Sequence, residues 1–305
     1  MAVVIGLDGG GTGTSVIVED LSSLKTLTYN LGPTNRHSVG DEKVLSTFKN
    51  LFETLFTDEG LSLEDIKSIC FGGAGIDTND DQRIVQDMFK KLGYKNHLQV
   101  VNDSMTALVG ANAGKNGAII ISGTGSVALG IDRCGEPVRV GGWGHLIDDT
   151  GSAYAIARDG IRLVLEGFDG RGDHTKIWDG MKKKLDLKSP EELLDFVYDP
   201  KRQKQDIAAL APIITDLSGK DHVADQIIDK TVDDLFIHIK ALSKRMETET
   251  FQVGMIGSVL EKSDHIRVRL EDKLQRNLPE VITHFPRKSP AEGAVLLAKS
   301  AMEKS

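Results

Sequence analysis

The chain has 305 residues, of which 40% are hydrophobic and 27% are charged, and these proportions are typical of a folded globular protein. At about 150 residues per domain, this length predicts two domains. The 45 acidic and 37 basic side chains leave a net charge of −8, which argues against wholesale binding of nucleic acid or of an anionic membrane surface.

The positions of glycine and cysteine exclude several further classes of protein. The 32 glycines follow no collagen-like period and gather in a few short loops. Cys70 and Cys134 form no CxxC pair and no Cys/His cluster, which excludes a disulfide framework, a zinc ribbon and a CxxC redox pair. The sequence shows neither a secretory leader pattern nor a long apolar stretch, so we expect a cytoplasmic protein without membrane contacts.

The first part of the chain alternates predicted strands with predicted helices. Short apolar, β-branched runs bounded by turn residues predict strands at 3–7, 14–18, 26–29, 66–71 and 98–101. Apolar residues at helical spacing predict amphipathic helices at 44–55 and 84–92. This alternation indicates an α/β sheet that opens with a β-meander.

A second copy of the opening pattern begins at Gly117. Strands are predicted at 118–121, 126–131 and 137–140, and the turn between the first two reads Gly-Thr-Gly-Ser at 123–126. The first meander carries Gly-Thr-Gly-Thr at 11–14 in the same context. The matched context favours duplication over coincidence.

The remainder of the chain is predicted to be mostly helical between 151 and 249. An apolar stripe from Ile228 to Met246 marks one long helix, and the pattern from Asp206 to Leu217 predicts another. A strand follows at 252–256, and Pro290 lies in the first turn of a final helix. The domain boundary is expected as a hinge near 111–117.

Spacing disfavours two common nucleotide-binding signatures. The segment 110–115 has three residues between its glycines where a P-loop has four, and Asn116 stands where a P-loop needs Ser or Thr. The segment 123–128 matches a dinucleotide fingerprint, but a strand pattern follows it where a helix should begin.

The glycine-rich turn after the first strand is the candidate phosphate-binding loop. Glycines let several backbone N–H groups approach an anion closely, and hydroxyl side chains add donors. An ordinary hairpin needs one or two glycines, whereas four of the residues 9–13 are glycine. Asp8, directly before them, suits Mg²⁺ held directly or through water. The candidate ATP phosphate ligands are Gly10, Gly11, Thr12, Gly13, Gly123, Thr124, Gly125 and Ser126.

These motifs resemble those of the superfamily of sugar kinases, actin and heat-shock chaperone ATPases. More narrowly, the chain resembles the N-acetylglucosamine kinase branch of the BadF/BadG/BcrA/BcrD-type ATPase family. The resemblance covers nearly the whole chain and rests on the motifs at 8–12, 102–103, 121–126, 141–145 and 149–152.

The resemblance implies a fold and an activity. The fold is α/β, with two ribonuclease H-like (actin-like ATPase) domains and a central cleft: residues 1–113 plus 290–305, and residues 114–289 with a helical insertion. The activity is ATP- and Mg²⁺-dependent phosphorylation of an amino sugar at its 6-hydroxyl. N-acetylglucosamine is the first expected acceptor, and N-acetylmuramic acid, glucosamine and glucose are alternatives. The family also implies a homodimer whose domains close over the sugar.

The resemblance assigns site residues as well. Asp103, after a predicted strand, would orient the sugar hydroxyl and accept its proton. Because Asp and Ser are favoured N-caps, a purely capping role for Asp103 or Ser104 stays open. The implied sugar ligands are Asn35, Asp103, Gly142, Trp143 and Asp149, and the implied adenosine ligands are Gly257 and Ser258.

The Gly-Gly-Trp-Gly-His loop and its continuation leave two questions open. Trp143 either shapes the sugar pocket or packs between the domains, and His145 is expected to brace the loop. The family's Gly-Asp-Glu-Gly-Ser ending is replaced by Asp148-Asp149-Thr150-Gly-Ser. One carboxylate is gained and one is lost, so the identity of the sugar stays open.

Three other functions fit the sequence less well. A dehydratase-activating ATPase needs thiolates for an iron–sulfur cluster, but Cys70 lies in an apolar strand and Cys134 stands alone in a turn. The cysteine-rich zinc motif of repressor/ORF/kinase-group kinases has no counterpart here. An actin-like filament or chaperone ATPase has no small-molecule substrate besides ATP, so it would not need Asn35 and the loop at 141–144 as sugar ligands.

Overall fold

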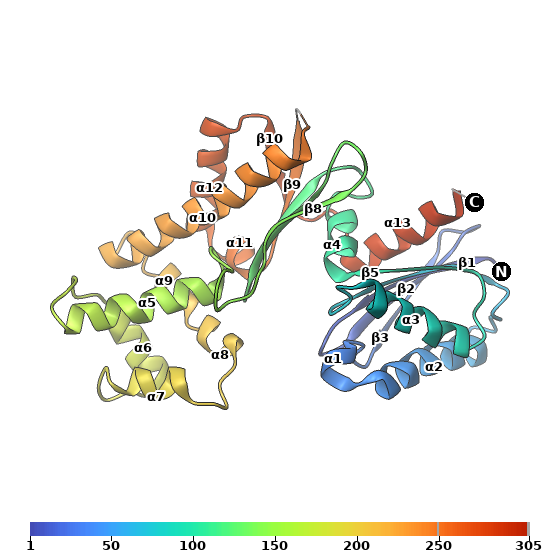
Figure 1. The fold of residues 1–305 in the computed structure, drawn as a ribbon, viewed down its shortest axis with the longest axis horizontal. Helices are drawn as coiled ribbons and strands as arrows, with labels where there is room; N and C mark the ends of the chain where they lie inside the picture. The colour runs from blue at the N-terminus through green and yellow to red at the C-terminus, as the bar shows by residue number, and fades with distance from the viewer. Residues whose placement is uncertain (249, 304–305) are drawn as a thin grey trace. The chain divides into compact units, whose positions relative to one another are not determined.

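The computed structural model describes residues 1–248 and 250–303 of the chain. The chain forms two compact units (Figure 1). Unit 1 comprises Met1–Asn116 and the C-terminal segment from Pro286, and unit 2 comprises Gly117–Phe285. Each unit is built on its own five-stranded sheet with helices packed against it, which confirms the α/β class.

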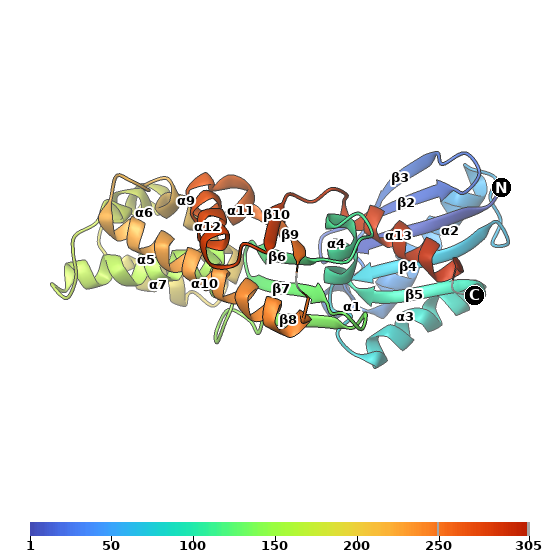
Figure 2. The same ribbon diagram turned by 90° about the horizontal axis from the view of Figure 1, so that it is seen from above.

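The sheet of unit 1 has the strand order β3-β2-β1-β4-β5, and Figure 2 shows the strands side by side. The first three strands form the antiparallel meander that the sequence predicts, and β1, β4 and β5 are parallel. The elements of unit 1 are β1 Val3–Gly9, β2 Thr14–Asp20, β3 Thr26–Leu31, α1 Arg36–Val39, α2 Asp41–Thr57, β4 Ile66–Gly73, α3 Asn79–Lys91, β5 His97–Asn102, α4 Asp103–Ala111 and α13 Pro290–Glu303.

Helices cover both faces of this sheet. On one face the helices α2 and α3 bring Phe48 and Phe89 together, with their rings stacked 4.5 Å apart. On the other face α13 lies directly on β1, because a Cβ atom placed on Gly6 would come within 2.5 Å of the Ala291 carbonyl oxygen. The end of the chain thus completes the core of the N-terminal unit.

Unit 2 repeats the sheet of unit 1. Its strand order is β10-β9-β6-β7-β8, with an antiparallel meander followed by two parallel strands in corresponding places. This shared topology supports the duplication inferred from the two glycine hairpins. The elements of unit 2 are β6 Ala118–Ser122, β7 Ser126–Ile131, β8 Pro137–Gly141, α5 Ala153–Phe168, α6 Ile177–Leu185, α7 Glu192–Tyr198, α8 Lys204–Ala208, α9 Ala211–Thr215, α10 His222–Met246, β9 Phe251–Ile256, α11 Ser258–Lys262, α12 Asp264–Asn277 and β10 Val281–His284.

One predicted helix of unit 2 is wrong. The single helix expected from Asp206 to Leu217 is two short helices, α8 and α9. Pro212 lies in the first turn of α9. Because proline has no N–H and its ring would clash with the carbonyl four residues earlier, the helix cannot run through this point. The short edge strand β10 and the helix α12 were not predicted.

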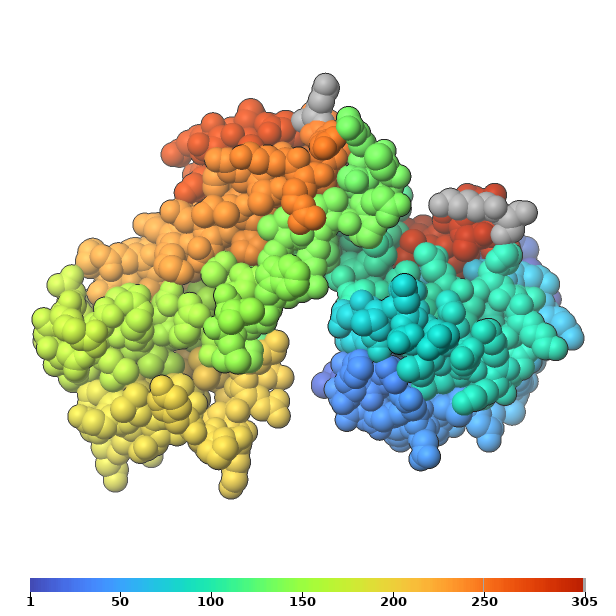
Figure 3. Space-filling model, in the orientation of Figure 1, coloured from blue at the N-terminus to red at the C-terminus, as the bar shows by residue number. Residues whose placement is uncertain are grey.

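The β7–β8 hairpin projects from the body of unit 2 in the space-filling view (Figure 3). Its turn carries Cys134, which is exposed, whereas Cys70 is buried in β4. In the described part of the chain, no helix combines the length and the apolar character that crossing a membrane requires.

Candidate functional site

The carboxyl ends of β1, β4 and β5 meet at one edge of the unit 1 sheet. In the parallel register, Asp8 of β1 pairs with Gly72 of β4, and Gly73 pairs with Asn102 of β5. Asp8 and Asp103 therefore come together at the edge where α/β sheets usually bind their ligands. This neighbourhood depends on strand order, because the two residues are far apart in the sequence.

Asp8 and Asp103 affect each other electrostatically. The pKa of Asp8 is raised to about 6, mainly by burial and to a smaller extent by the nearby charge of Asp103. Burial also raises the pKa of Asp103, and the charge of Asp77 adds to the effect. A raised pKa gives a carboxylate a higher affinity for a proton near neutral pH, as a general base requires.

The N-cap of α4 is Asn102. Its side-chain oxygen accepts a hydrogen bond from the backbone N–H of Ser104 at 3.0 Å, and Asp103 is the first residue of the helix. The N-cap is therefore Asn102, and the expectation that Asp103 or Ser104 could take the cap position is wrong. The Asp103 carboxylate also faces the start of α4, and hydrogen bonds from the backbone N–H groups of Ser104 and of Asp103 itself offset part of the rise that burial gives its pKa.

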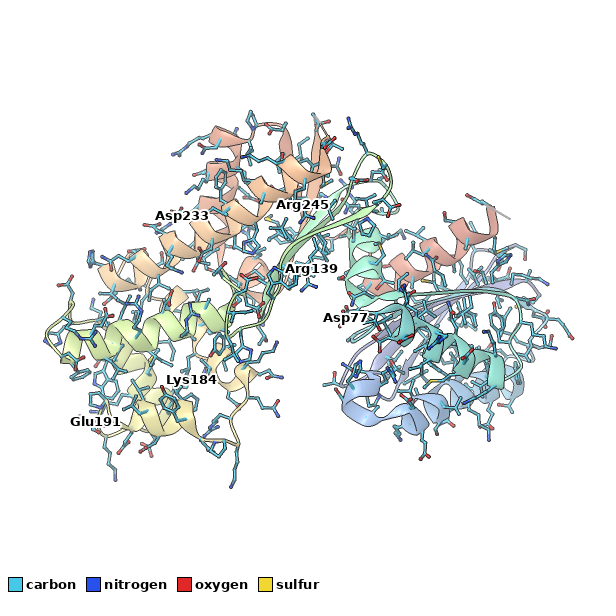
Figure 4. All side chains as sticks on the ribbon, viewed as in Figure 1. Asp77, Arg139, Lys184, Glu191, Asp233 and Arg245 are labelled. Carbon is cyan, nitrogen blue, oxygen red and sulfur yellow. The ribbon has the colours of Figure 1, made fainter. Side chains whose placement is uncertain are left out.

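A third carboxylate, Asp77, also belongs to this edge, although no sequence motif singled it out. It lies in the loop after β4 (Figure 4), and its Oδ1 accepts a hydrogen bond from the Asn102 side chain at 3.0 Å. Asp77 thus contacts the residue that caps α4, and its charge acts on Asp103. Its position just beyond a parallel strand is a usable signal only once the strand order is known.

The glycine hairpin of unit 1 also holds Asn35. The backbone N–H of Asn35 donates to the Gly10 carbonyl at 3.2 Å. Its side-chain oxygen caps α1 by accepting from the N–H of His37 at 3.1 Å. The Asn35 amide nitrogen remains as a donor, which suits the predicted contact with a sugar hydroxyl.

The hairpin glycines leave open space beside the backbone. A Cβ atom on Gly123 would meet nothing within 4 Å, and one on Gly10 or Gly11 would meet nothing closer than 3.4 Å. None of these three glycines has φ in the left-handed region. Neither backbone conformation nor packing explains why they are glycine, whereas close approach of a ligand does.

The hydroxyl groups of the two hairpins differ in whether they already have a hydrogen-bond partner in the described part of the chain. At equivalent positions, Thr14 donates to the Gly32 carbonyl at 2.9 Å and Ser126 donates to the Thr150 carbonyl at 2.7 Å. The hydroxyls of Thr12 and Thr124 have no partner within 1–248 and 250–303. The two threonines at the hairpin tips can therefore donate to a ligand, while the Ser126 hydrogen is already used.

In unit 2, Asp149 lies against the second hairpin. Its side chain is buried, and its Oδ2 is 2.7 Å from the place a Cβ on Gly125 would take. The Ser126–Thr150 hydrogen bond and a 2.7 Å bond from Ser122 to the Gly151 carbonyl fasten the loop to the hairpin. A predicted sugar ligand and the predicted phosphate hairpin thus share one corner of unit 2.

The loop before Asp149 presents Trp143 to solvent. The Trp143 side chain is 70% exposed, and its backbone N–H donates to Asp148 Oδ2 at 3.1 Å. The His145 ring meets Tyr154 of α5 edge-on, with centroids 4.8 Å apart. Asp148 and His145 thus hold the loop at both of its sides.

The turn at Gly257 lies against the end of β6. Gly257 has φ 101°, and a Cβ there would come within 2.5 Å of the Ser122 carbonyl oxygen. Its N–H donates to Glu261 at 2.8 Å. Gly257 and Ser258 therefore lie next to the strand that leads into the second hairpin.

The candidate metal ligands are few. In residues 1–248 and 250–303, no three His, Cys, Asp or Glu side chains form a group that could enclose a metal ion. Mg²⁺ typically takes one or two carboxylates together with substrate phosphates and water, and Asp8 with its neighbour Asp103 fits that pattern. Burial raises the pKa of the Cys70 thiol to about 12, which opposes the thiolate form that iron–sulfur ligation needs.

Comparison with known proteins gives matches over nearly the whole chain. The sequence profile of the BadF/BadG/BcrA/BcrD ATPase family matches residues 5–298. The chain is 34% identical to an N-acetylmuramic acid/N-acetylglucosamine kinase of Clostridium acetobutylicum, over 98% of this chain and 99% of that protein. It is 31% identical to an N-acetyl-D-glucosamine kinase of Dictyostelium discoideum, over 97% of each chain.

Solved structures share the fold at lower identity. A Chromobacterium violaceum protein provisionally assigned as an N-acetylglucosamine kinase superposes with a TM-score of 0.74 at 22% identity, covering 98% of this chain and 99% of that one. A ROK family glucokinase from Streptomyces griseus, in complex with glucose and AMPPNP, gives 0.57 at 16% identity over 99% and 100%. These likenesses confirm the predicted two-domain, actin-like fold.

Proposed function

The chain belongs to the BadF/BadG/BcrA/BcrD ATPase family, and from this membership we propose that it is an ATP-dependent sugar kinase. The acceptor we propose is N-acetylglucosamine, phosphorylated at its 6-hydroxyl. The family relatives from Clostridium and Dictyostelium, each above 30% identity over nearly full length, support this choice.

One observation carries the proposal most directly. Asp103 lies at the carboxyl edge of the unit 1 sheet with a raised pKa, and its carboxylate is not the cap of α4. Asn35, a donor suited to a sugar hydroxyl, is tied to the glycine hairpin of the same unit. A proton acceptor and a hydroxyl ligand near a phosphate-type loop are the parts that phosphoryl transfer to an alcohol needs.

In this proposal the glycine hairpins bind the phosphates of ATP. Their open space admits close approach, and the tip hydroxyls of Thr12 and Thr124 donate to phosphate oxygens. Asp8 would hold Mg²⁺ directly or through water, and the ion would supply charge neutralisation for the phosphates. Gly257 and Ser258, beside the second hairpin, are assigned to adenosine.

The chemical step is a phosphoryl transfer between oxygens. The 6-oxygen of the sugar forms a bond to the γ-phosphorus of ATP, and the bond from that phosphorus to the bridging oxygen of ADP breaks. Asp103 accepts the proton that the hydroxyl loses. The products are ADP and the sugar 6-phosphate.

The choice among acceptors rests on unit 2. Asp149 and the loop at 141–144 are assigned to the sugar, with Asp149 as a ligand of its hydroxyls. A buried carboxylate binds paired hydroxyls well, because hydrogen bonds to a charged acceptor are stronger than neutral ones. N-acetylmuramic acid, glucosamine and glucose follow N-acetylglucosamine as alternative acceptors.

A coupled assay of ADP release tests the proposal. The purified full-length chain is given ATP, Mg²⁺ and each of the four sugars in turn, with a sugar-free reaction as the baseline. We expect the highest kcat/KM with N-acetylglucosamine. ADP release that no sugar raises above the baseline would remove the kinase assignment.

A further inference from the structure

Arg139 is a fixed cation beside the loop assigned to the sugar. It lies on the edge strand β8 (Figure 4), and its Nε donates to the Gly141 carbonyl at 3.0 Å. Its Nη2 donates to the Gly142 carbonyl, and its guanidinium carbon lies 5.1 Å from the centroid of the Trp143 ring. Two carbonyls and an aromatic face together hold the group in one orientation.

The Arg139 side chain points away from the core of unit 2. Side chains alternate along a strand, and its neighbour Val138 is buried in the core to which α10 contributes. Arg139 is paired with Leu129 of β7 in the antiparallel register. Both side chains therefore lie on the face of the sheet that is opposite to Val138. Its guanidinium is therefore accessible to a small molecule.

The positive charge of Arg139 has no counterion in the part of the chain that the structure describes. No carboxylate there lies within ion-pair distance of it, although the chain carries a net charge of −8. By contrast, Arg133, at the other end of the same hairpin, pairs with Glu247. An arginine that is oriented but unpaired next to a binding loop is suited to an anionic group of a ligand.

We propose that Arg139 determines how the kinase discriminates among the acceptors proposed above, because its guanidinium binds the carboxylate that N-acetylmuramic acid carries and N-acetylglucosamine lacks. This inference rests on the proposed function and names Arg139 as the residue that recognises an acidic acceptor. The two sugars differ by a lactyl ether that carries a carboxylate. The guanidinium has five N–H donors, and those not used on Gly141 and Gly142 remain for a carboxylate.

The phosphates of ATP are the other source of an anion. Phosphate is already assigned to the hairpins at 10–13 and 123–126, whereas Arg139 holds the loop assigned to the sugar. We therefore favour the sugar carboxylate, and the kinetic test below separates the two sources.

The test compares Arg139→Gln and Arg139→Lys with the wild-type chain. Arg133→Gln, on the same hairpin, is the matched control. For each, kcat/KM is measured with N-acetylglucosamine and with N-acetylmuramic acid, and KM for ATP is measured with both sugars. Calorimetric binding of N-acetylmuramic acid provides a readout that does not need turnover, and thermal unfolding verifies the fold of each variant.

We expect Arg139→Gln to lower the ratio of kcat/KM for N-acetylmuramic acid to that for N-acetylglucosamine by about 10- to 100-fold, because a hydrogen bond to a charged group is lost. Arg139→Lys should restore part of the ratio, and Arg133→Gln should leave it unchanged. KM for ATP should stay within about twofold of wild type, because the proposed contact of Arg139 is with the sugar. A tenfold change would require the loss of about 1.4 kcal/mol of ATP binding free energy.

Three results would overturn the inference. An equal loss with both sugars would mean that Arg139 only braces the loop. A rise in KM for ATP with both sugars would mean that Arg139 binds a phosphate of ATP and not the sugar carboxylate. Turnover of N-acetylglucosamine alone, with no binding of N-acetylmuramic acid, would refute the inference and leave the proposed function standing. No turnover with any sugar would instead refute the proposed function, and calorimetry would still decide the role of Arg139.

Discussion

The open space at Gly123 predicts an unusual effect of the substitution Gly123→Ala. A Cβ there meets no atom within 4 Å, and the φ of Gly123 is outside the left-handed region. An alanine that fits the native backbone reduces the entropy of the unfolded chain. The free energy of unfolding of the unliganded protein should therefore stay the same or rise by up to about 1 kcal/mol.

ATP binding should suffer in the same variant. The methyl group would occupy the space through which the backbone N–H groups of the hairpin approach a phosphate. The loss of one hydrogen bond to a charged group costs about 1.5–3 kcal/mol, which corresponds to a rise in KM for ATP of about 10- to 150-fold. Stability is retained and nucleotide affinity is lost.

Urea unfolding and steady-state kinetics measure the two effects. Gly172→Ala is the control, because a Cβ there would make only ordinary contacts of 3.4 Å or more in a loop outside the candidate site. The control should change neither quantity. A loss of more than about 1 kcal/mol of stability in Gly123→Ala would show that its surroundings are filled. An unchanged KM for ATP would refute the phosphate assignment of the second hairpin.

Three further predictions concern the carboxylates of unit 1. Asp103→Asn should lower kcat by about 10²- to 10⁴-fold while calorimetric sugar binding persists, and retained turnover would remove Asp103 as the base. Burial raises the pKa of Asp8 from 3.8 to about 6, so the folded state holds this proton more tightly and stability falls as the pH rises through that window. Asp8→Asn should therefore stabilise the unliganded protein at pH 7 by up to about 3 kcal/mol in urea unfolding while abolishing turnover, and a less stable variant would contradict the burial argument. Asp77→Ala should lower kcat more than Asp77→Asn, because only asparagine keeps an oxygen that accepts from Asn102. Equal kcat values for the two variants would show that this hydrogen bond does not position Asp103.

Local pattern was sufficient for the hairpins and most of the strands. The apolar runs that flank 10–13 and 123–126 are short, β-branched and bounded by glycine, so strand and turn could be predicted without knowledge of the rest of the fold. The repeat of this pattern also allowed a duplicated fold to be inferred. The break between α8 and α9 was visible in principle, because Pro212 interrupts the helical pattern.

Contacts that depend on strand order could not be predicted in the same way. Asp77 reaches Asn102 because β4 and β5 are parallel neighbours, a fact that no short window of sequence contains. Arg139 likewise shows no distinctive spacing, and its role emerges from the carbonyls and the ring that orient it. The net charge of the whole chain gives no indication of this cation.

The sugar oxygen that receives the phosphate distinguishes transfer to the 6-hydroxyl from every other reaction of ATP. The purified chain is incubated with ATP, Mg²⁺ and N-acetylglucosamine, and the product is examined by NMR beside a parallel reaction with the 6-deoxy sugar. We expect a single phosphate ester at the 6-oxygen, formed in step with ADP release, and no sugar-dependent ADP release with the 6-deoxy sugar. A phosphate ester at another oxygen, or ADP release that is independent of any sugar, would contradict this expectation.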